Sequence, residues 1–284
     1  MHDMEEMRRH TRTIATVTFV FVALWIAAAS DAQEPAKYTP AEETELAMKL
    51  SNPLSDLVSV PFQFNWDQKV GPGEDTRFIL NLQPAMPFTL SENWNLIARL
   101  IVPFVSQPAL FEGGSPTFGV SDVLTSFFFS PSRPGAVIWG VGPAISMRSA
   151  SEPTLGTGKW SAGPSIVVLR QTGPWTYGML WNQVWSFAGD PARRDVNQMF
   201  LQPFVSYQAT PSVTLSMSTE TTANWESDDH TWTVPIQVFV SKLSSFGPFP
   251  ASYQLGLGTF VSKPEIGPSW RLRLNMVILL PRRR

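Results

Sequence analysis

The sequence contains no cysteine and little charge. The 284 residues include no Cys, so no disulfide framework holds the fold. Charged residues make up 15% of the chain, against roughly 25% in a soluble globular protein. The formal net charge of −2 gives no electrostatic basis for binding nucleic acid. Hydrophobic residues make up 43% and exclude a disordered chain. A surface so poor in charge belongs either to a chain that is nearly all core or to one that faces lipid.

The N-terminus has the organisation of an export signal. Arg8, Arg9 and Arg12 precede an uncharged run, Thr13–Ser30. At its end, Ser30-Asp31-Ala32 has small residues at the first and third positions, as a cleavage site requires. This order is typical of a cleaved secretory signal, and we predict one at residues 1–32. An uncleaved membrane anchor is the alternative, since the run is at the lower end of the length that spans a bilayer.

Residues 33–56 differ from the rest of the chain and are expected to form a periplasmic segment with one short helix. Thr39-Pro40-Ala41-Glu42 supplies an N-cap, a first-turn proline and a capping glutamate. Asn52-Pro53 ends the helix. A helix of about three turns is too short to be stable alone in water, so it requires a surface to pack on.

From residue 57 to residue 284 the apolar side chains recur at every second position. Trp175, Tyr177 and Met179, for example, alternate with Thr176 and Gly178. A period of two indicates strands with one apolar and one polar face. Twelve such segments are predicted, at about 57–66, 77–88, 94–105, 118–129, 137–148, 159–170, 174–187, 197–208, 212–225, 231–242, 252–262 and 269–280.

The length of these segments favours an all-β, transmembrane antiparallel barrel of about twelve strands. They exceed the usual 5 to 6 residues of soluble strands and match tilted strands that cross a membrane. Long and short connections alternate, except at Ser130–Ala136 and Leu243–Ala251. Nine of the 11 Trp fall at strand ends, where membrane interfaces would lie. A secreted soluble β-sandwich is the alternative.

The alternation also assigns polar side chains to the inside of the barrel. A charge that faced the middle of the bilayer would cost roughly 2 to 4 kcal/mol, so charged strand residues should face a lumen. They form either a salt-bridge network without a transport role or a selectivity filter. The lumen-lining candidates are Arg99, Asp122, Asn182, Gln202, Glu220, Gln237, Arg271, Arg273 and Asn275.

Apolar residues are expected inside as well, toward the periplasmic mouth. Apolar groups in open water are unfavourable by about 25 cal/mol per Å², so something should cover them. We expect the helix at residues 40–51 to dock there as a partial plug, through Leu46 and Leu50 against Phe204 and Phe239. The alternative is an apolar path for an apolar solute.

The sequence offers little catalytic chemistry. His230 is the only histidine after residue 32, and it has no evident partner serine for a lipolytic site. The loop Asp228-Asp229-His230 is expected to be a solvated acidic loop rather than a metal site. Gly156-Thr157-Gly158-Lys159 lacks the spacing of a phosphate-binding loop. We therefore expect no enzyme activity, cofactor or metal.

Several short motifs resemble one group of bacterial proteins. The most specific is Leu155–Trp160, with sequence LGTGKW, and others are Val60-Pro61-Phe62, Gln202-Pro203-Phe204 and Thr222–Glu226. The chain from about Asn52 onward is similar to exported barrels often labelled neuromedin U or transporter, related to the family of the phenol-degradation meta-pathway. The resemblance implies an outer-membrane barrel of a Gram-negative bacterium that passes small, often aromatic or hydrophobic, compounds.

The function expected from these observations is a passive, porin-like channel in the cell outer membrane for the uptake of small molecules. The alternative is a non-conducting structural or adhesion barrel that works through its extracellular loops. The partners would be outer-membrane lipid, a small-molecule solute and the barrel insertion machinery. Many such barrels end on an aromatic residue that the insertion machinery reads, whereas this sequence ends on Pro281 and three arginines.

Overall fold

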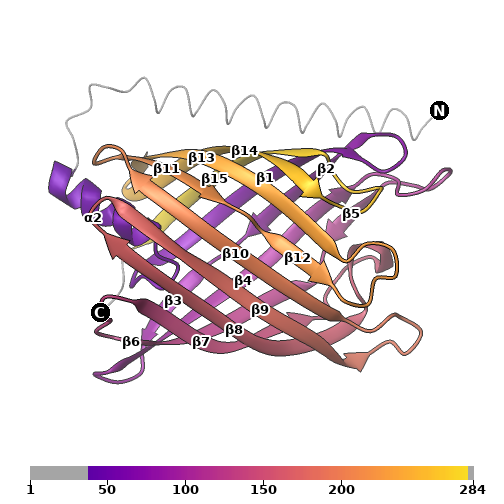
Figure 1. Ribbon diagram of the computed structural model, residues 1–284, viewed down its shortest axis with the longest axis horizontal. Coiled ribbons are helices and arrows are strands. Elements are labelled where there is room, and N and C mark those ends of the chain that lie inside the picture. The colour runs from indigo at the N-terminus through magenta and orange to yellow at the C-terminus, as the bar shows by residue number, and fades with distance from the viewer. Residues whose placement is uncertain (1–37, 281–284) are drawn as a thin grey trace. The chain divides into compact units, whose positions relative to one another are not determined.

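Antiparallel strands form one closed ring in the computed structural model, which describes residues 38–280 (Figure 1). The ring closes where β1 (Val58–Val70) pairs with β15 (Trp270–Leu280), over eleven residue pairs from Val58↔Leu280 to Gln68↔Trp270. The predicted signal peptide at residues 1–32 and the four C-terminal residues lie outside the described part.

The prediction of twelve strands is confirmed. Three predicted strands are each interrupted once, as β2/β3, β5/β6 and β11/β12, so fifteen ladder segments make twelve passes around the ring. The remaining segments are β2 (Asp75–Leu82), β3 (Ala85–Thr89), β4 (Trp94–Gln107), β5 (Thr117–Val120), β6 (Val123–Pro131), β7 (Ile138–Met147), β8 (Lys159–Thr172), β9 (Trp175–Gly189), β10 (Asn197–Gln208), β11 (Val213–Ser218), β12 (Thr221–Asn224), β13 (Trp232–Phe246) and β14 (Phe249–Ser262).

Each interruption lies opposite a proline on a neighbouring strand. Proline has no N–H, so it can accept a ladder hydrogen bond but cannot return one. The one-sided bonds run from the backbone N–H groups of Gln83, Ser121 and Thr219 to the carbonyl oxygens of Pro61, Pro103 and Pro203, at 2.9, 2.9 and 3.2 Å. The breaks in the ladder therefore have a cause in the sequence.

The two faces of the wall follow the predicted alternation. On β9, the exposed fractions of Trp175, Tyr177 and Met179 are 46%, 44% and 40%, while Thr176 and Leu180, which point inward, are buried. Tryptophans also meet at strand ends, where the rings of Trp94 and Trp139, and those of Trp225 and Trp232, make edge contacts. The outer surface is thus apolar and aromatic, as lipid contact requires.

The helix α2 (Pro40–Leu50) lies at one end of the barrel (Figure 1). The backbone oxygen of Met48 accepts a hydrogen bond of 2.8 Å from Gln171 Nε2, at the end of β8. Lys49 forms an ion pair with Glu45 of the same helix at 3.1 Å and another with Asp56 at 3.3 Å, and the second ties the helix to the chain that follows. Within residues 38–280, no helix is both long and apolar enough to cross a membrane.

One predicted connection is wrong. The long turn expected at Leu243–Ala251 is a two-residue hairpin loop, because Phe246 at the end of β13 pairs directly with Phe249 at the start of β14. Gly247 takes a φ of +58°, which glycine adopts without strain and which a tight turn needs. The other exception, Ser130–Ala136, remains a loop, since β6 ends at Pro131 and β7 begins at Ile138.

Candidate functional site

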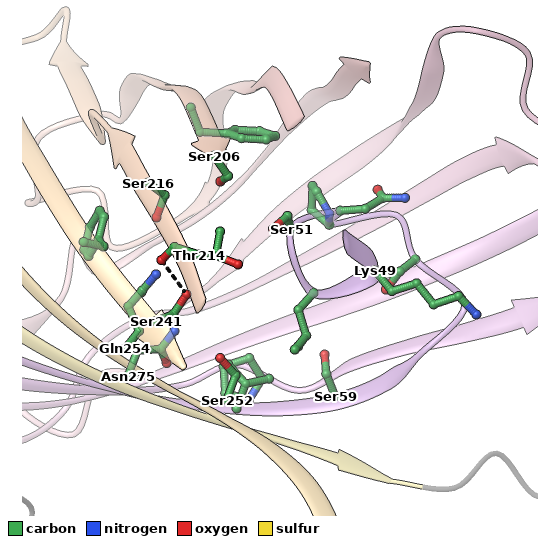
Figure 2. A pocket seen from close by; sticks show the side chains of 18 of the residues that line it. Lys49, Ser51, Ser59, Ser206, Thr214, Ser216, Ser241, Ser252, Gln254 and Asn275 are labelled. Carbon is green, nitrogen blue, oxygen red and sulfur yellow. Dashed lines mark hydrogen bonds between the residues drawn. The ribbon is translucent and has the colours of Figure 1, made fainter. Parts of the chain in front are cut away.

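A cavity of about 310 Å³ lies inside the barrel, between the segment that follows α2 and the surrounding strands (Figure 2). Its wall is formed by β1, β3, β4, β9, β10, β11, β13, β14 and β15 and combines polar with apolar side chains. The hydroxyl groups come from Ser51, Ser55, Ser59, Ser206, Ser212, Thr214, Ser216, Ser218, Ser241 and Ser252. Such a lining suits water and small polar groups.

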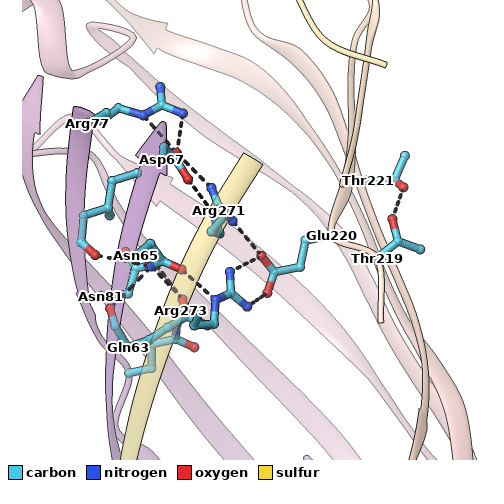
Figure 3. Close-up of polar contacts among 12 residues, drawn as sticks. Gln63, Asn65, Asp67, Arg77, Asn81, Thr219, Glu220, Thr221, Arg271 and Arg273 are labelled. Atoms are coloured by element: carbon cyan, nitrogen blue, oxygen red, sulfur yellow. Dashed lines mark hydrogen bonds and ion pairs between the residues drawn. The ribbon is translucent and has the colours of Figure 1, made fainter. Parts of the chain in front are cut away.

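An ion-pair network lies deeper in the lumen (Figure 3). Asp67 is fully buried and accepts hydrogen bonds from Arg77 at 2.7 Å and from Arg271 at 3.0 Å. Glu220 accepts bonds of 2.6 and 2.7 Å from the two terminal nitrogens of Arg273, and Arg271 approaches it at 3.4 Å. The two carboxylates are therefore fully engaged by three arginines.

Strand register explains how this network forms. On β15, Arg271 and Arg273 are two residues apart and so point to the same face. Their direct partners on β1 are Asp67 and Asn65, and Arg273 Nε donates to Asn65 Oδ1 at 2.6 Å. Glu220 comes from the interruption between β11 and β12, three positions away around the ring. The network thus joins two distant parts of the wall.

Arg99 stands apart from this network. It lies on β4, lines the cavity and donates a 2.6 Å hydrogen bond to Gln83 Oε1. Among residues 38–280, none of the ion pairs involves Arg99. The guanidinium therefore brings positive charge to the cavity without a carboxylate in direct contact with it.

The lumen-lining candidates occupy different positions in the structure. Those on the cavity wall are Arg99, Gln202, Glu220, Arg273 and Asn275. Arg271 belongs to the ion-pair network. Asn182 and Gln237 are buried but are not part of the cavity wall.

Asp122 has a different position from the one expected. Its carboxylate binds the loop between β7 and β8, where it accepts hydrogen bonds from the backbone N–H groups of Ser149, Ala150 and Thr157 at 3.2, 3.1 and 2.7 Å. The cause is local, because Asp122 falls in the break between β5 and β6. It anchors a loop and does not line the cavity.

The LGTGKW motif, at residues 155–160, runs from this loop between β7 and β8 into the start of β8. A Cβ at Gly156 would lie 2.7 Å from Asp122 Oδ1, and Gly158 has a φ of +73°. Arg193 Nη2 donates to the backbone oxygen of Pro153 at 3.0 Å. Lys159 donates to Asp195 at 2.9 Å, and this hydrogen bond lowers the pKa of that exposed carboxyl. The motif is thus a folded loop at the end of the barrel opposite α2 rather than a ligand-binding signature.

Leu54 is the residue that sequence reasoning missed. It inserts into an inward-facing apolar cluster with Ile97, Phe128, Leu169 and Leu180. Asn52 Oδ1 accepts a 2.9 Å hydrogen bond from the Leu54 N–H and so shapes the turn that delivers it. Leu54 therefore covers this cluster, whereas Phe239 lines the cavity. The signal that could have indicated Leu54 is the apolar residue just after the helix-ending Asn52-Pro53.

The expected plug contacts are only partly brought together. Leu50, Phe204 and Phe239 all line the cavity, whereas Leu46 is half-buried on α2 and does not. Phe204 also packs against the Leu54 cluster.

His230 has a partner that was not evident from the sequence. Its Nε2 lies 3.2 Å from the hydroxyl oxygen of Ser262 on β14. The pair is distant in sequence but adjacent in the fold, and no carboxylate is placed against the histidine by the contacts of the described residues. Across residues 38–280, no cluster of three or more His, Cys, Asp or Glu could hold a metal ion.

Comparisons with known proteins give structural likenesses only, since no family model and no curated protein sequence matches the chain. An outer-membrane channel of the COG4313 group from Pseudomonas putida F1 superposes with a TM-score of 0.61 at 18% identity, covering 79% of this chain and 94% of that one. The chain has the fold of an outer-membrane barrel. The NanC porin gives 0.51 at 9% identity, covering 79% and 100%. At these sequence identities the similarity shows the fold alone, so a function must be argued from the site of this chain.

We predict that Glu220→Gln destabilises the barrel strongly. The substitution keeps the shape but removes the carboxylate that faces Arg273, whose exposed fraction is 4%. Removing one partner of a buried pair costs about 3 to 5 kcal/mol. Urea unfolding in detergent, followed by tryptophan fluorescence, measures the change. Glu92→Gln, in an exposed turn, is the matched control, and equal stability of the two variants would contradict the structural role of the network.

Proposed function

We propose that this protein is a passive channel of the cell outer membrane that admits small molecules. The observation that carries the proposal is a polar cavity inside a closed barrel whose outer surface is apolar. A barrel of twelve strands is wider than the eight-strand barrels that side chains fill. The outward apolar surface supports a lipid environment, and the inward hydroxyl groups support passage of hydrated solutes.

We further propose that residues 33–56 act as a partial plug at the periplasmic end. Leu54 covers the apolar cluster, and the segment from Ala47 to Leu57 contributes one side of the cavity wall. A segment held by a single inserted leucine and a few hydrogen bonds can leave its site at modest cost. The plug would therefore restrict the pore without sealing it permanently.

Deletion of residues 33–56 tests both proposals. We expect the full-length protein to conduct in planar lipid bilayers, and the deletion variant to show a larger single-channel conductance because the lumen is wider. Each preparation must first show the heat-dependent gel shift of a folded barrel. Absence of conductance in both forms would contradict the channel, and favour a structural or adhesion barrel. Equal conductance would contradict the plug alone.

We also propose that the barrel has no hydrolase activity, although the contact between Ser262 and His230 resembles two parts of a catalytic triad. A hydrolase needs a third group to orient the imidazole, and the contacts of His230 do not supply one. Ser262 is also engaged with the backbone oxygen of Trp232, at 3.4 Å. The pair is better suited to fixing the loop before β13 to β14.

Purified protein in mixed micelles should therefore release no fatty acid from phosphatidylcholine, with or without added calcium. Hydrolysis that His230→Ala and Ser262→Ala both abolish would contradict the proposal. Asp229→Asn serves as a control for the charge of the same loop.

A further inference from the structure

The cavity carries more positive than negative charge. Three cations, Lys49, Arg99 and Arg273, and one carboxylate, Glu220, contribute to its wall. Glu220 has both oxygens bound by Arg273, so its direct hydrogen bonds go to that arginine. Lys49 is balanced by Glu45 and Asp56, which are outside the lining. Arg99 is the cation of this lining that none of the ion pairs of residues 38–280 engages.

Arg99 is placed to bind an anion. A guanidinium has five N–H donors, and the hydrogen bond to Gln83 Oε1 uses one of them. Arg99 is half-buried, and its lumen side opens onto the cavity. An arginine can bind both oxygens of a carboxylate at once, through two parallel charge-assisted hydrogen bonds.

The rest of the cavity favours an anion with an apolar body. Ile97 lies two residues from Arg99 on the same face of β4, and Leu180, Phe204 and Phe239 line the same space. Serine hydroxyls complete the polar part of the wall, as Figure 2 shows for Ser59, Ser206 and Ser216. The volume of about 310 Å³ is at the small end of ligand pockets. The site therefore suits a compact organic molecule.

We propose that Arg99 binds the carboxylate of a small organic acid whose apolar part rests against Phe204 and Phe239. This inference rests on the proposed channel function and names the class of solute that the lumen would hold. Such a site would favour organic monoanions over uncharged compounds of the same shape. Arg271 and Arg273 are already bound to Asp67 and Glu220, so the carboxylate of the ligand would bind Arg99.

Calorimetric titration of the detergent-solubilised, full-length protein tests the proposal with three probes. Benzoate carries both features of the proposed ligand, benzamide keeps the ring without the charge, and acetate keeps the charge without the ring. We expect benzoate to bind about tenfold or more tightly than either of the others. Equal affinity for benzoate and benzamide, or no benzoate binding at all, would overturn the proposal.

Variants assign the effect to Arg99. Arg99→Gln should weaken benzoate binding about tenfold or more and leave benzamide unchanged, whereas Arg99→Lys should restore part of the affinity because it restores the charge. Arg194→Gln removes an exposed arginine of an outer loop and should leave benzoate affinity as in the wild type. The wild-type comparison of the three probes remains decisive if Arg99→Gln fails to fold.

Different results would contradict the anion site and the channel. Conductance with no preference for benzoate over benzamide in binding would overturn the anion site and leave the channel intact. Benzoate binding by a protein that does not conduct would contradict the channel and leave the site as a binding site only.

Discussion

Closure of the backbone hydrogen-bond ring is the constraint on which the rest of this structure depends. In hydrocarbon no water satisfies a free N–H or C=O group, so a sheet can cross a membrane only without edges. The pairing of β1 with β15 over eleven residue pairs removes the two edges that the chain would otherwise have. Once the ring is closed, every second side chain must face lipid and its neighbours must face a lumen. The prolines that interrupt the ladder all accept a bond from the opposing strand, so closure tolerates them.

Charged side chains inside a closed barrel must find their partners among the other inward-facing side chains. Asp67 and Glu220 are bound by arginines from β2 and β15, and the resulting network supports the wall across the lumen. Arg99 lies outside that network and faces a cavity rich in hydroxyl groups. The interior therefore contains a paired network around Asp67 and Glu220 that stabilises the wall, and a separate arginine, Arg99, that can still bind a ligand. Leu54 covers the apolar cluster and separates it from water.

The strands were predictable because alternation is a local property, repeated along each segment. The same parity assigned Arg271, Arg273 and Glu220 to the interior, and in the structure these three residues form ion pairs with one another. The alternation did not predict the position of Asp122. This residue lies in the break between β5 and β6, where its carboxylate binds the loop between β7 and β8 instead of facing the lumen. Leu54 and the pairing of His230 with Ser262 depend on how distant segments meet. The local alternation of apolar and polar residues does not report contacts between segments distant in the sequence. The hairpin at Gly247 was not predicted, because the two prolines beside it suggested a longer turn.

The most direct test of the account uses spin labels at two adjacent positions of β11, in protein reconstituted into lipid bilayers. Leu215 is 49% exposed on the outer surface and is not part of the cavity wall, whereas Ser216 lines the cavity. A lipid-facing wall predicts that a label at position 215 is relaxed by oxygen, which concentrates in hydrocarbon, and that a label at position 216 is relaxed by a water-soluble nickel complex. The reverse pattern, or aqueous contact at both positions, would contradict a lipid-facing barrel with a polar lumen.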